Sequence, residues 1–243
     1  MPAFFESLLN QSFQDFEIII VDGFSVDDSL AIIETYRGIF QDRLKLKLVK
    51  ERNIGLVRNK GAELTRAPII FHTNSDVLFP RYLLEDIWKI YAANTDLISL
   101  TGRTTPVSTS VLCSFCYGVF DLLRCLFSKA PFPIKKFRPG GSFISIRTPV
   151  FHSVKGFPNV RINEDGLLGY RIDDYLRIHK TSVKFAWNLH IYHYAKRFNT
   201  KGSIQTVLFY SYVVGNMLPF LKPFFSHIEK RSAETFVSRK DLI

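Results

Sequence analysis

The chain has 243 residues with 47% hydrophobic content, which suffices for one sizeable core with a small appended lobe. Its net charge of +10 calls for an anionic partner, but the basic residues are scattered and form no zinc finger, RNA-binding sheet or basic-region helix, so we expect no nucleic-acid partner. The three cysteines, Cys113, Cys116 and Cys125, exclude a disulfide framework and a four-ligand zinc site, and they fit a reducing, intracellular setting.

The hydrophobic pattern of the first third of the chain alternates between helix and strand. Helices are predicted at residues 4–10, 25–40 and 56–65, and strands at residues 17–21, 44–49 and 68–73. This alternation predicts an α/β fold with a doubly wound, mostly parallel (mixed) sheet flanked by helices. In such a sheet, ligands bind at the carboxyl ends of the strands.

Two predicted strands end in an aspartate. Asp22 follows the β-branched run Ile18–Val21, and Asp76 follows the apolar stretch at residues 68–71. Acids at two strand ends indicate a ligand crevice, with Asp76 placed as a metal ligand. The alternative is that both are turn residues or helix caps, which aspartate often is.

Two apolar segments occupy residues 110–132 and 204–225. Neither is an uninterrupted apolar run of about 20 residues, so we do not expect a membrane crossing. Each is interpreted either as an interfacial helix on anionic lipid or as a helix of the core or of a dimer contact. The first residues lack a signal-peptide pattern, and we expect a cytoplasmic protein that lies peripherally on the inner face of the membrane.

Several stretches carry a resemblance to a known family. Residues 7–12 and 15–22 resemble its opening helix and second strand, and residues 22–29 its Asp-Gly-Ser-x-Asp turn. Asn53, Gly55, Arg58, Asn59 and Gly61 match its Asn-Gly and Arg-Asn-Gly pattern. Residues 139–147, 150–158 and 163–172 resemble its glycine-rich acceptor-side strand, its Gly-Phe turn and its Glu-Asp motif. On these motifs the chain resembles the family 2 glycosyltransferases of the GT-A fold over residues 3–195.

The resemblance implies a complete set of site residues. The nucleotide-sugar-binding residues would be Asp22 at the uracil edge, Arg58 near the nucleotide, and Ser25, Asp27, Asn53, Asn74 and Ser75. The acceptor side would include Gly140 and Gly141, where small residues let a substrate approach the backbone. Asp165 would be the catalytic base, with Glu164 beside it, and Asp76 and His193 would hold Mn²⁺ or Mg²⁺ against the pyrophosphate.

Three of these assignments have competing interpretations. The family's Asp-x-Asp reads here as Asn74-Ser75-Asp76, so one carboxylate is an amide and we expect weaker metal binding. Glu164 and Asp165 also suit a helix N-terminus through its dipole. His193 lies in an aromatic strand, where a histidine is more often a core residue.

The resemblance also implies a domain organisation and a function. Residues 1–200 would form the GT-A domain, with a nucleotide-sugar-binding half (1–105) and an acceptor half (106–200), followed by apolar helices at 201–243. We expect an inverting transferase that moves a sugar from a UDP- or GDP-linked donor to a glycan or lipid-linked acceptor. The alternative is a non-catalytic binding or membrane-associated subunit with the same fold.

One family element has no counterpart in the sequence. The family's central first strand precedes the helix that begins here near Phe4. Without it, two neighbouring strands would have unpaired backbone groups, each costing about 1–3 kcal/mol. We therefore expect an upstream start, a rearranged sheet or a poorly active protein.

Overall fold

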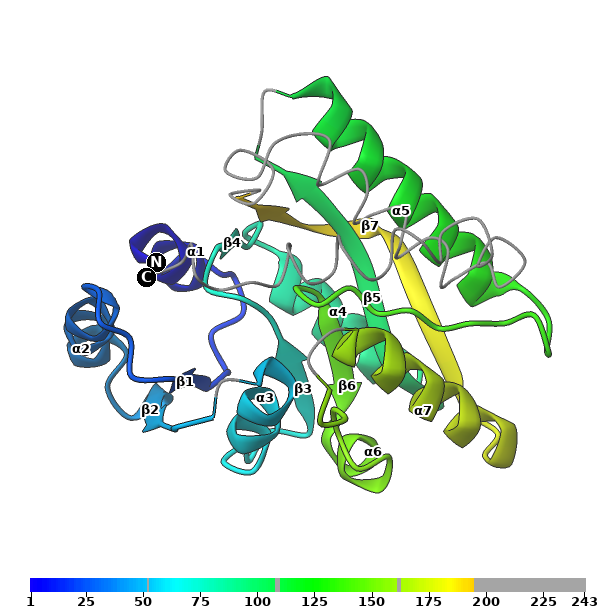
Figure 1. Ribbon diagram of the computed structural model, residues 1–243, viewed down its shortest axis with the longest axis horizontal. Helices are drawn as coiled ribbons and strands as arrows, with labels where there is room; N and C mark the ends of the chain where they lie inside the picture. Colours follow the sequence, from blue (N-terminus) through cyan, green and yellow to red (C-terminus); the bar gives the residue numbers. More distant parts are fainter. Residues whose placement is uncertain (52, 108–109, 161–162, 195–243) are drawn as a thin grey trace.

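The computed structural model describes residues 1–51, 53–107, 110–160 and 163–194 (Figure 1). The helices are α1 (Pro2–Leu9), α2 (Ser29–Phe40), the 3₁₀ turn η1 (Gln41–Arg43), α3 (Ile54–Ala62), α4 (Leu83–Ala93), α5 (Val111–Lys129), α6 (Thr148–Ser153) and α7 (Glu164–Ile178). The strands are β1 (Ile18–Asp22), β2 (Leu44–Leu48), β3 (Ile69–His72), β4 (Val77–Leu78), β5 (Leu97–Pro106), β6 (Ile144–Arg147) and β7 (Ser182–His193). The C-terminal helices predicted at 201–243 lie outside the described residues.

The strands form two separate sheets. A two-stranded parallel sheet has the order β1-β2, and a five-stranded mixed sheet has the order β3-β6-β5-β7-β4. In the larger sheet β5 and β7 are parallel, whereas β6 runs antiparallel to both β3 and β5. The predicted mixed α/β architecture with flanking helices is therefore confirmed, although the sheet is divided.

The predicted elements of the first third are present, and the largest boundary shift is at the start of α2. Helix α2 begins at Ser29 and not at Ser25, because the carboxylate of Asp22 accepts hydrogen bonds from the backbone N–H and the hydroxyl of Ser25, both at 2.7 Å. These bonds hold residues 22–25 in a turn of the type that aspartate favours. Neither Ser25 nor Asp27 is the N-cap of α2, which is Asp28.

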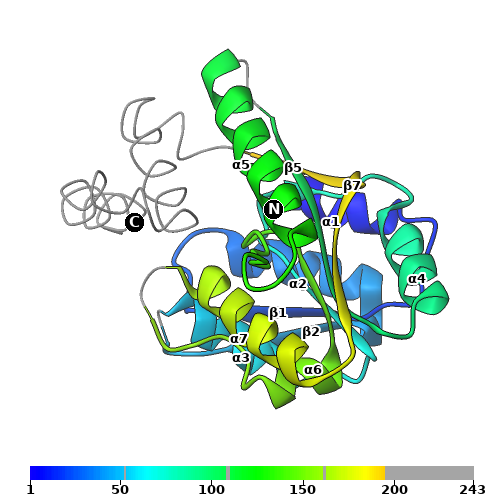
Figure 2. The same cartoon turned by 90° about the vertical axis from the view of Figure 1, so that its right-hand side faces the viewer.

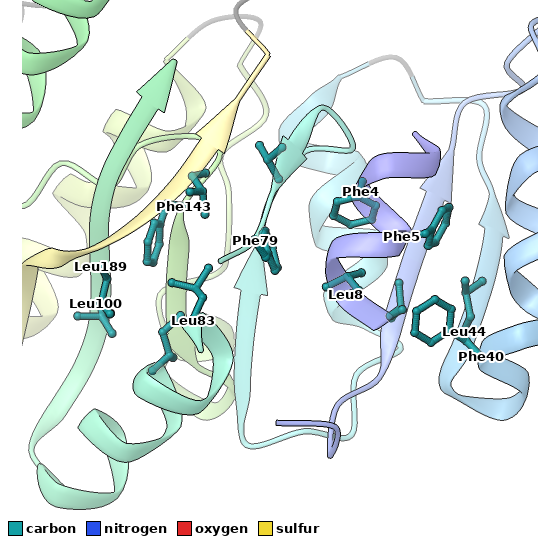
Figure 3. Packing of buried hydrophobic residues seen from close by; sticks show 14 of the residues in the cluster. Phe4, Phe5, Leu8, Phe40, Leu44, Phe79, Leu83, Leu100, Phe143 and Leu189 are labelled. Carbon is teal, nitrogen blue, oxygen red and sulfur yellow. The ribbon is translucent and has the colours of Figure 1, made fainter. Parts of the chain in front are cut away.

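Two hydrophobic clusters occupy the two faces of the sheets. The first contains residues of α1, α2 and α4 (Figure 3). Ile20, Ile69 and Phe71 of the strands are partly buried and pack against it. The second contains residues of α6 and α7 and Ala62 of α3, with Ile70 packed against it. Since Ile70 alternates with its neighbours along β3, α1 and α3 cover opposite faces.

A cavity of about 910 Å³ lies between β1 and β3, and we call it the slot. Residues 16–22 and 66–73 form its two long walls, and residues of α1, α3 and α4 line it as well. Among the described residues β1 pairs with β2 alone and β3 with β6 alone, so the edges facing the slot carry no ladder. The described strands thus form two sheets, and no rearrangement closes the gap between β1 and β3.

Helix α5 packs along β5 and β7 with one face (Figure 2). On that face Arg124, 1% exposed, pairs with Asp121 at 2.7 Å and donates to the carbonyl of Arg138. The cysteines of α5 are free thiols, and Cys113 and Cys125 are buried. By length and composition α5 could also cross a membrane, a property that buried core helices share.

Candidate active site

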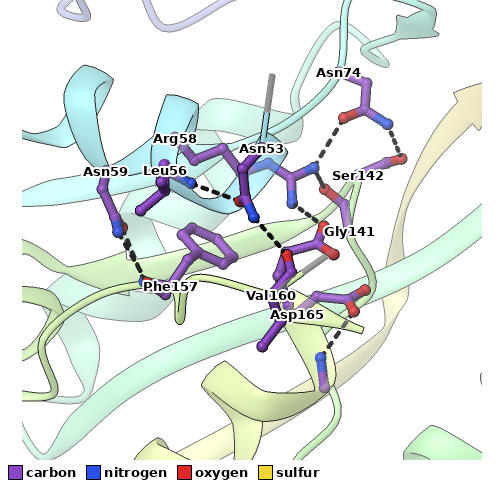
Figure 4. Close-up of polar contacts among 12 residues, drawn as sticks. Asn53, Leu56, Arg58, Asn59, Asn74, Gly141, Ser142, Phe157, Val160 and Asp165 are labelled. Carbon is purple, nitrogen blue, oxygen red and sulfur yellow. Dashed lines mark hydrogen bonds and ion pairs between the residues drawn. The ribbon is translucent and has the colours of Figure 1, made fainter. Parts of the chain in front are cut away.

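Arg58 is the centre of the polar site. Helix α3 carries it on its buried face, and its guanidinium donates to Glu164 Oε1 at 3.1 Å, Asn74 Oδ1 at 2.9 Å and the carbonyl of Gly141 at 2.6 Å (Figure 4). Burial lowers the pKa of Arg58 from its usual value, and the carboxylates of Glu164 and Asp165 oppose this shift. One cation thus joins three segments that are far apart in the sequence.

The asparagine in place of the family's first carboxylate is part of this cluster. Asn74 Oδ1 accepts from Arg58, while its Nδ2 donates to the hydroxyl of Ser142 at 2.9 Å. The side chain therefore uses both functions of its amide and joins α3 to the glycine-rich segment. Ser75, the next residue, lines the slot beside it.

Asn53 and Asn59 attach α3 to the segment at residues 157–160. Asn53 caps α3 by accepting from the N–H of Leu56 at 3.1 Å, and its Nδ2 donates to the carbonyl of Val160 at 2.7 Å. Asn59 accepts from the N–H of Phe157 and donates to its carbonyl, both at 2.9 Å. In this structure the side-chain amides of Asn53 and Asn59 form hydrogen bonds with main-chain groups.

The acid pair opens α7, as the helix-terminus interpretation also requires. Glu164 is 12% exposed and bonded to Arg58. Asp165 accepts from the N–H of Gly166 at 2.8 Å through Oδ1, and its Oδ2 would lie 3.2 Å from a Cβ added at Gly141. Asp165 therefore faces the main chain of Gly141, whereas Glu164 forms an ion pair with the guanidinium of Arg58.

The two glycines of the acceptor side have different neighbours. A Cβ at Gly140 would lie 3.0 Å from the guanidinium of Arg124, so that position packs against the buried ion pair of α5. Gly141 contacts the site directly, because its carbonyl accepts from Arg58. The pair thus links the packing of α5 to the polar site.

Asp76, directly before β4, lies close to His193, the last residue of β7. Asp76 Oδ2 lies 3.5 Å from His193 Nε2, and His193 Nδ1 is 2.9 Å from the hydroxyl of Tyr117 on α5. A metal-binding imidazole characteristically has its second nitrogen hydrogen-bonded in this way. The donor set, a carboxylate and an imidazole, fits a divalent cation, although no group of three or more His, Cys, Asp or Glu is found among the described residues.

Asp22 and Asp27 lie on the two-stranded sheet and its turn. Asp22 is 8% exposed, and both its oxygens are bonded to Ser25. Asp27 accepts from the N–H of Ser29 at 3.0 Å at the start of α2. Asp22, Ser25, Arg58, Asn74 and Ser75 all line the carboxyl end of the slot, which we call the polar mouth.

A buried histidine lies behind Arg58. His72 ends β3 and packs between the rings of Phe151 and Phe157, with centroid distances of 4.8 and 4.9 Å. Burial, and to a lesser extent the charge of Arg58, lowers the pKa of His72 to about 3. The imidazole is therefore neutral at physiological pH.

The structure adds residues that the sequence motifs did not single out as site residues. Asn59, Ser142 and Phe157 complete the surroundings of Arg58, whose guanidinium lies 5.3 Å from the Phe157 ring. Ser142 could have been predicted as a site residue, because it directly follows the glycine pair Gly140 and Gly141. Tyr117 lies within an apolar stretch and had no signal in the sequence.

The chain is similar to a known family and to individual curated proteins. The family model described as glycosyl transferase family 2 matches residues 1–128. Poly(ribitol-phosphate) beta-N-acetylglucosaminyltransferase TarP of Staphylococcus aureus (strain N315) is 34% identical over 97 residues, or 38% of this chain and 29% of that protein. The putative glycosyltransferase EpsH of Bacillus subtilis (strain 168) is 36% identical over 93 residues, or 38% and 27%. The chain thus spans less than a third of the length of these two curated relatives.

Solved structures with a similar fold are glycosyltransferases as well. S. aureus TarS superposes with a TM-score of 0.58 at 18% identity, over 85% of this chain and 36% of that one. The mannosyltransferase PcManGT of Pyrobaculum calidifontis, solved with GDP-Man and Mn²⁺, gives a TM-score of 0.60 at 16% identity, over 93% and 64%. These likenesses establish the GT-A fold. Because the family model covers more than half of the residues, the chain belongs to glycosyl transferase family 2.

Proposed function

We propose that this chain transfers a sugar from a UDP- or GDP-linked donor to a glycan or lipid-linked acceptor, with inversion at the anomeric carbon. One observation carries the proposal: Asp22, Arg58, Asn74 and Ser75, from two sheets and a helix, line one polar mouth at the carboxyl ends of β1 and β3. Open α/β sheets bind their ligands at this edge. Relatives support the donor class, since TarS has been solved with UDP-GlcNAc and PcManGT with GDP-Man.

Asp165 is proposed as the base. It would take the proton of the acceptor hydroxyl as that oxygen bonds to the anomeric carbon and the bond to the nucleoside diphosphate breaks. The absence of a side chain at Gly141 leaves room beside Asp165 Oδ2. Glu164, at 3.1 Å from Arg58, is a positioning residue that orients the guanidinium.

Asp76 and His193 are the residues proposed to hold a divalent ion. When bound, the ion would neutralise charge on the leaving diphosphate. Tyr117 fixes the ring of His193 so that Nε2 faces Asp76. Arg58 stays in place as a second cation close to the polar mouth.

Calorimetric titration with UDP and GDP, each with Mn²⁺, tests the donor site first. We expect saturable, metal-dependent binding of one nucleotide, weakened at least tenfold in Asp76→Ala and unchanged in Asp174→Ala, a control at an exposed acid of α7. No binding of either nucleotide by the folded protein would refute the enzyme and favour the non-catalytic alternative. The interruption of the sheet beside Asp22 is the observation that supports that alternative.

Turnover tests the role of Asp165. Proton transfer by a positioned side chain typically contributes about 10²–10⁴-fold. Asp165→Asn should therefore keep nucleotide affinity within threefold while losing at least a hundredfold in release of nucleoside diphosphate from the matching nucleotide sugar. Asp174→Asn on the same helix is the matched control. Equal turnover in both variants would remove Asp165 from the mechanism.

Membrane contact of α5 is the second part of the proposal. Five apolar residues, Leu112, Phe115, Val119, Leu122 and Leu126, repeat at alternating steps of three and four along α5 and are 37–66% exposed. This spacing places them on one helix face, and Lys129 is exposed at its end. An apolar helix face with cations beside it suits an anionic lipid surface.

Sedimentation with vesicles tests this contact. The protein should co-sediment with phosphatidylglycerol vesicles and much less with phosphatidylcholine vesicles. The double variant Phe115→Glu/Leu122→Glu should lose most of this binding. Val26→Glu, at a residue that is 88% exposed on the two-stranded sheet side, should not. Self-association by α5 without vesicle binding would favour the dimer interpretation.

A further inference from the structure

We propose that Asp173 is a positioning residue for the transfer step. It fastens residues 137–141, which we call the acceptor segment, to α7, the helix that also carries Asp165. Asp173 thereby sets the gap between Asp165 and the main chain of Gly141, into which the acceptor hydroxyl has to fit. The inference rests on the proposed function, because it assigns Asp173 a part in that reaction.

The residues of α7 that contact the acceptor segment form one row. Asp165, Gly169 and Asp173 are spaced four residues apart, so they lie on the same side of the helix over about 12 Å. A Cβ at Gly169 would overlap the carbonyl oxygen of Phe137. Phe137 lies at the Asp173 end of the row, and Gly141 lies at the Asp165 end. The segment therefore runs along α7 in the direction opposite to the helix (Figure 1).

The carboxylate of Asp173 is buried and holds the start of the segment. It is 4% exposed, and Oδ1 and Oδ2 accept from the N–H of Phe137 at 3.0 and 3.2 Å. Oδ2 also accepts from Arg138 Nη1 at 3.3 Å, and Nη1 donates to the carbonyl of Phe137 at 2.7 Å. The guanidinium of Arg138 lies over the ring of Tyr170, 3.7 Å from its centroid. Both main-chain groups of Phe137 are thus bonded to the Asp173–Arg138 pair.

The acceptor segment is attached to three helices. Arg124 of α5 donates to the carbonyl of Arg138 at 2.8 Å. Arg58 of α3 donates to the carbonyl of Gly141 at 2.6 Å. Asp173 supplies the attachment to α7. Because α7 also carries the proposed base, this third attachment sets how far the segment lies from the base.

The charge of Asp173 can be changed by pH. Burial raises the pKa of Asp173 to about 6, although a backbone N–H, Arg138 and Lys135 favour the ionised form. On α7 the ring of Tyr170 faces Arg138, and Arg124 of α5 reaches the carbonyl of Arg138 and not the carboxylate. Protonation therefore removes the charge that pairs with Arg138. Since the usual pKa is 3.8, the folded protein binds this proton more tightly than the unfolded chain, so protonation of Asp173 does not itself favour unfolding.

Turnover per donor site tests the role of Asp173. Release of nucleoside diphosphate is followed with UDP-GlcNAc and GDP-Man, the donors in the solved relatives, with water as the acceptor. The rate is divided by the number of nucleotide sites that calorimetric titration counts in the same sample, so unfolded protein does not enter it. Asp173→Asn keeps an acceptor for the N–H of Phe137 and removes the charge.

At pH 7.5 we expect kcat per site to be at least about tenfold lower in Asp173→Asn than in the parent chain. A misplacement of about 1 Å can cost up to about 10²-fold in rate. The KM for the nucleotide sugar should stay within about threefold, because the polar mouth is not altered. Asp174→Asn, at an exposed acid of the same helix, should match the parent chain.

The pH profile separates a positioning role of the charge from a structural role of the side chain. Asparagine is uncharged at every pH, whereas most Asp173 carboxylates are protonated at pH 5. The ratio of kcat per site between parent chain and Asp173→Asn should therefore shrink from about tenfold at pH 7.5 to less than about threefold at pH 5. Other titrating groups affect both proteins and cancel in the ratio.

Two outcomes overturn the inference in an active parent chain. Equal kcat per site in the parent chain and Asp173→Asn at pH 7.5 would mean that the attachment does not position the segment. A ratio that stays constant between pH 7.5 and pH 5 would place the effect in packing.

A second variant applies if Asp173→Asn does not fold. Arg138→Lys keeps the positive charge but replaces the guanidinium that bonds to both Asp173 and Phe137. It should show the same loss of kcat with unchanged KM, and a kcat equal to that of the parent chain would overturn the inference. Absence of turnover in the parent chain would refute the proposed function and this inference with it, whereas an active parent chain with unaffected variants refutes the inference alone.

Discussion

The five-stranded sheet and the two-stranded sheet contribute to the same polar mouth but are held in place differently. In the larger sheet, β3, β6, β5 and β7 are joined by ladders, with register shifts between β5 and β7. The buried Arg124–Asp121 pair of α5 hydrogen-bonds to β5, at the carbonyl of Gly102 and the N–H of Thr104. The smaller sheet faces the slot and is joined to the rest by helix packing, by Glu17 and by α3. The candidate base and metal residues belong to the first region, whereas Asp22 belongs to the second. The residues proposed for the chemistry and for recognition of the nucleotide base therefore lie in regions that are attached to the rest of the molecule in different ways.

Arg58 lies on α3, the helix that packs on the smaller sheet, and it bonds to residues beside the larger sheet. Arg58→Ala removes the hydrogen bonds to Asn74, Gly141 and Glu164 and takes the guanidinium away from the largely buried Glu164 carboxylate, which should cost about 3–5 kcal/mol in the free energy of unfolding. Urea denaturation measures this. Lys60→Ala, at an exposed cation of the same helix, should change stability by less than about 0.5 kcal/mol.

A double-mutant cycle sharpens the same point. If the cost of Arg58→Ala comes from the stranded charge, Arg58→Ala/Glu164→Gln should be more stable than the sum of the single effects by about 1 kcal/mol or more. Strict additivity would place the cost in lost packing against Phe157 instead.

Gly102 tests the continuity of the larger sheet. A Cβ there would lie 2.6 Å from the carbonyl of Leu189 and 2.6 Å from the ring of Phe143, so Gly102→Ala should destabilise by about 1–3 kcal/mol. Gly118→Ala on α5 meets nothing within 4 Å and should be neutral or stabilising by up to about 1 kcal/mol. The midpoints of thermal unfolding of the two variants measure this difference. Equal midpoints would contradict the close packing of β5 at Gly102.

His72 gives the larger sheet a characteristic pH dependence. Its pKa is about 3 in the folded protein and 6.5 when unperturbed, so the unfolded state binds the extra proton between these values. The stabilising contribution is present above pH 6.5 and is lost as the pH falls toward 3, which amounts to about 2 kcal/mol between pH 7 and pH 5. Between pH 7 and pH 5 the free energy of unfolding of His72→Phe should therefore fall by about 2 kcal/mol less than that of the parent chain. His152→Phe, at an exposed position, should follow the parent chain.

Glu17 probes the weaker attachment of the smaller sheet. Glu17→Ala removes the acceptor of the Arg66 and Ala67 N–H groups and the 2.6 Å ion pair with Lys45, with an expected loss of about 1 kcal/mol. Glu34→Ala, at an exposed ion pair of α2, should cost less than about 0.5 kcal/mol. Hydrogen exchange in β1 should accelerate in Glu17→Ala alone, and unchanged exchange would show that helix packing suffices.

Local pattern was sufficient for the first third of the fold. The β-branched runs of β1 and β3 and the caps of α3 and α5 are encoded by neighbouring residues, so these elements were predicted to within a few positions. The order β3-β6-β5-β7-β4 was not predictable in this way, because it depends on pairing between strands distant in sequence. The predicted helix began too early, at Ser25, because the hydroxyl of Ser25 suits both a helix cap and a turn.

In the candidate site, too, the sequence predicted some features and not others. The motifs brought Arg58, Asn74 and Glu164 into one prediction, and the structure places them in direct contact. Which acid is engaged and which faces the glycine backbone could not be inferred, because Glu164 and Asp165 are adjacent and differ by one methylene. The Tyr117 contact with His193 joins residues 76 positions apart and leaves no local trace.

The attachment of residues 155–160 to α3 and α7 has a consequence for how the sequence can change. Asn53, Asn59 and Arg171 all bond to main-chain atoms of this segment, at Val160, Phe157, Gly156 and Lys155. Every residue type offers the same carbonyl, and nearly every type the same N–H. Substitutions at Pro158 and Val160 can therefore keep these bonds, whereas Asn159 also accepts from Asn53 Nδ2 at 3.2 Å through its own side chain. The sequence of this surface can thus vary at those two positions while Arg58 and its partners stay fixed.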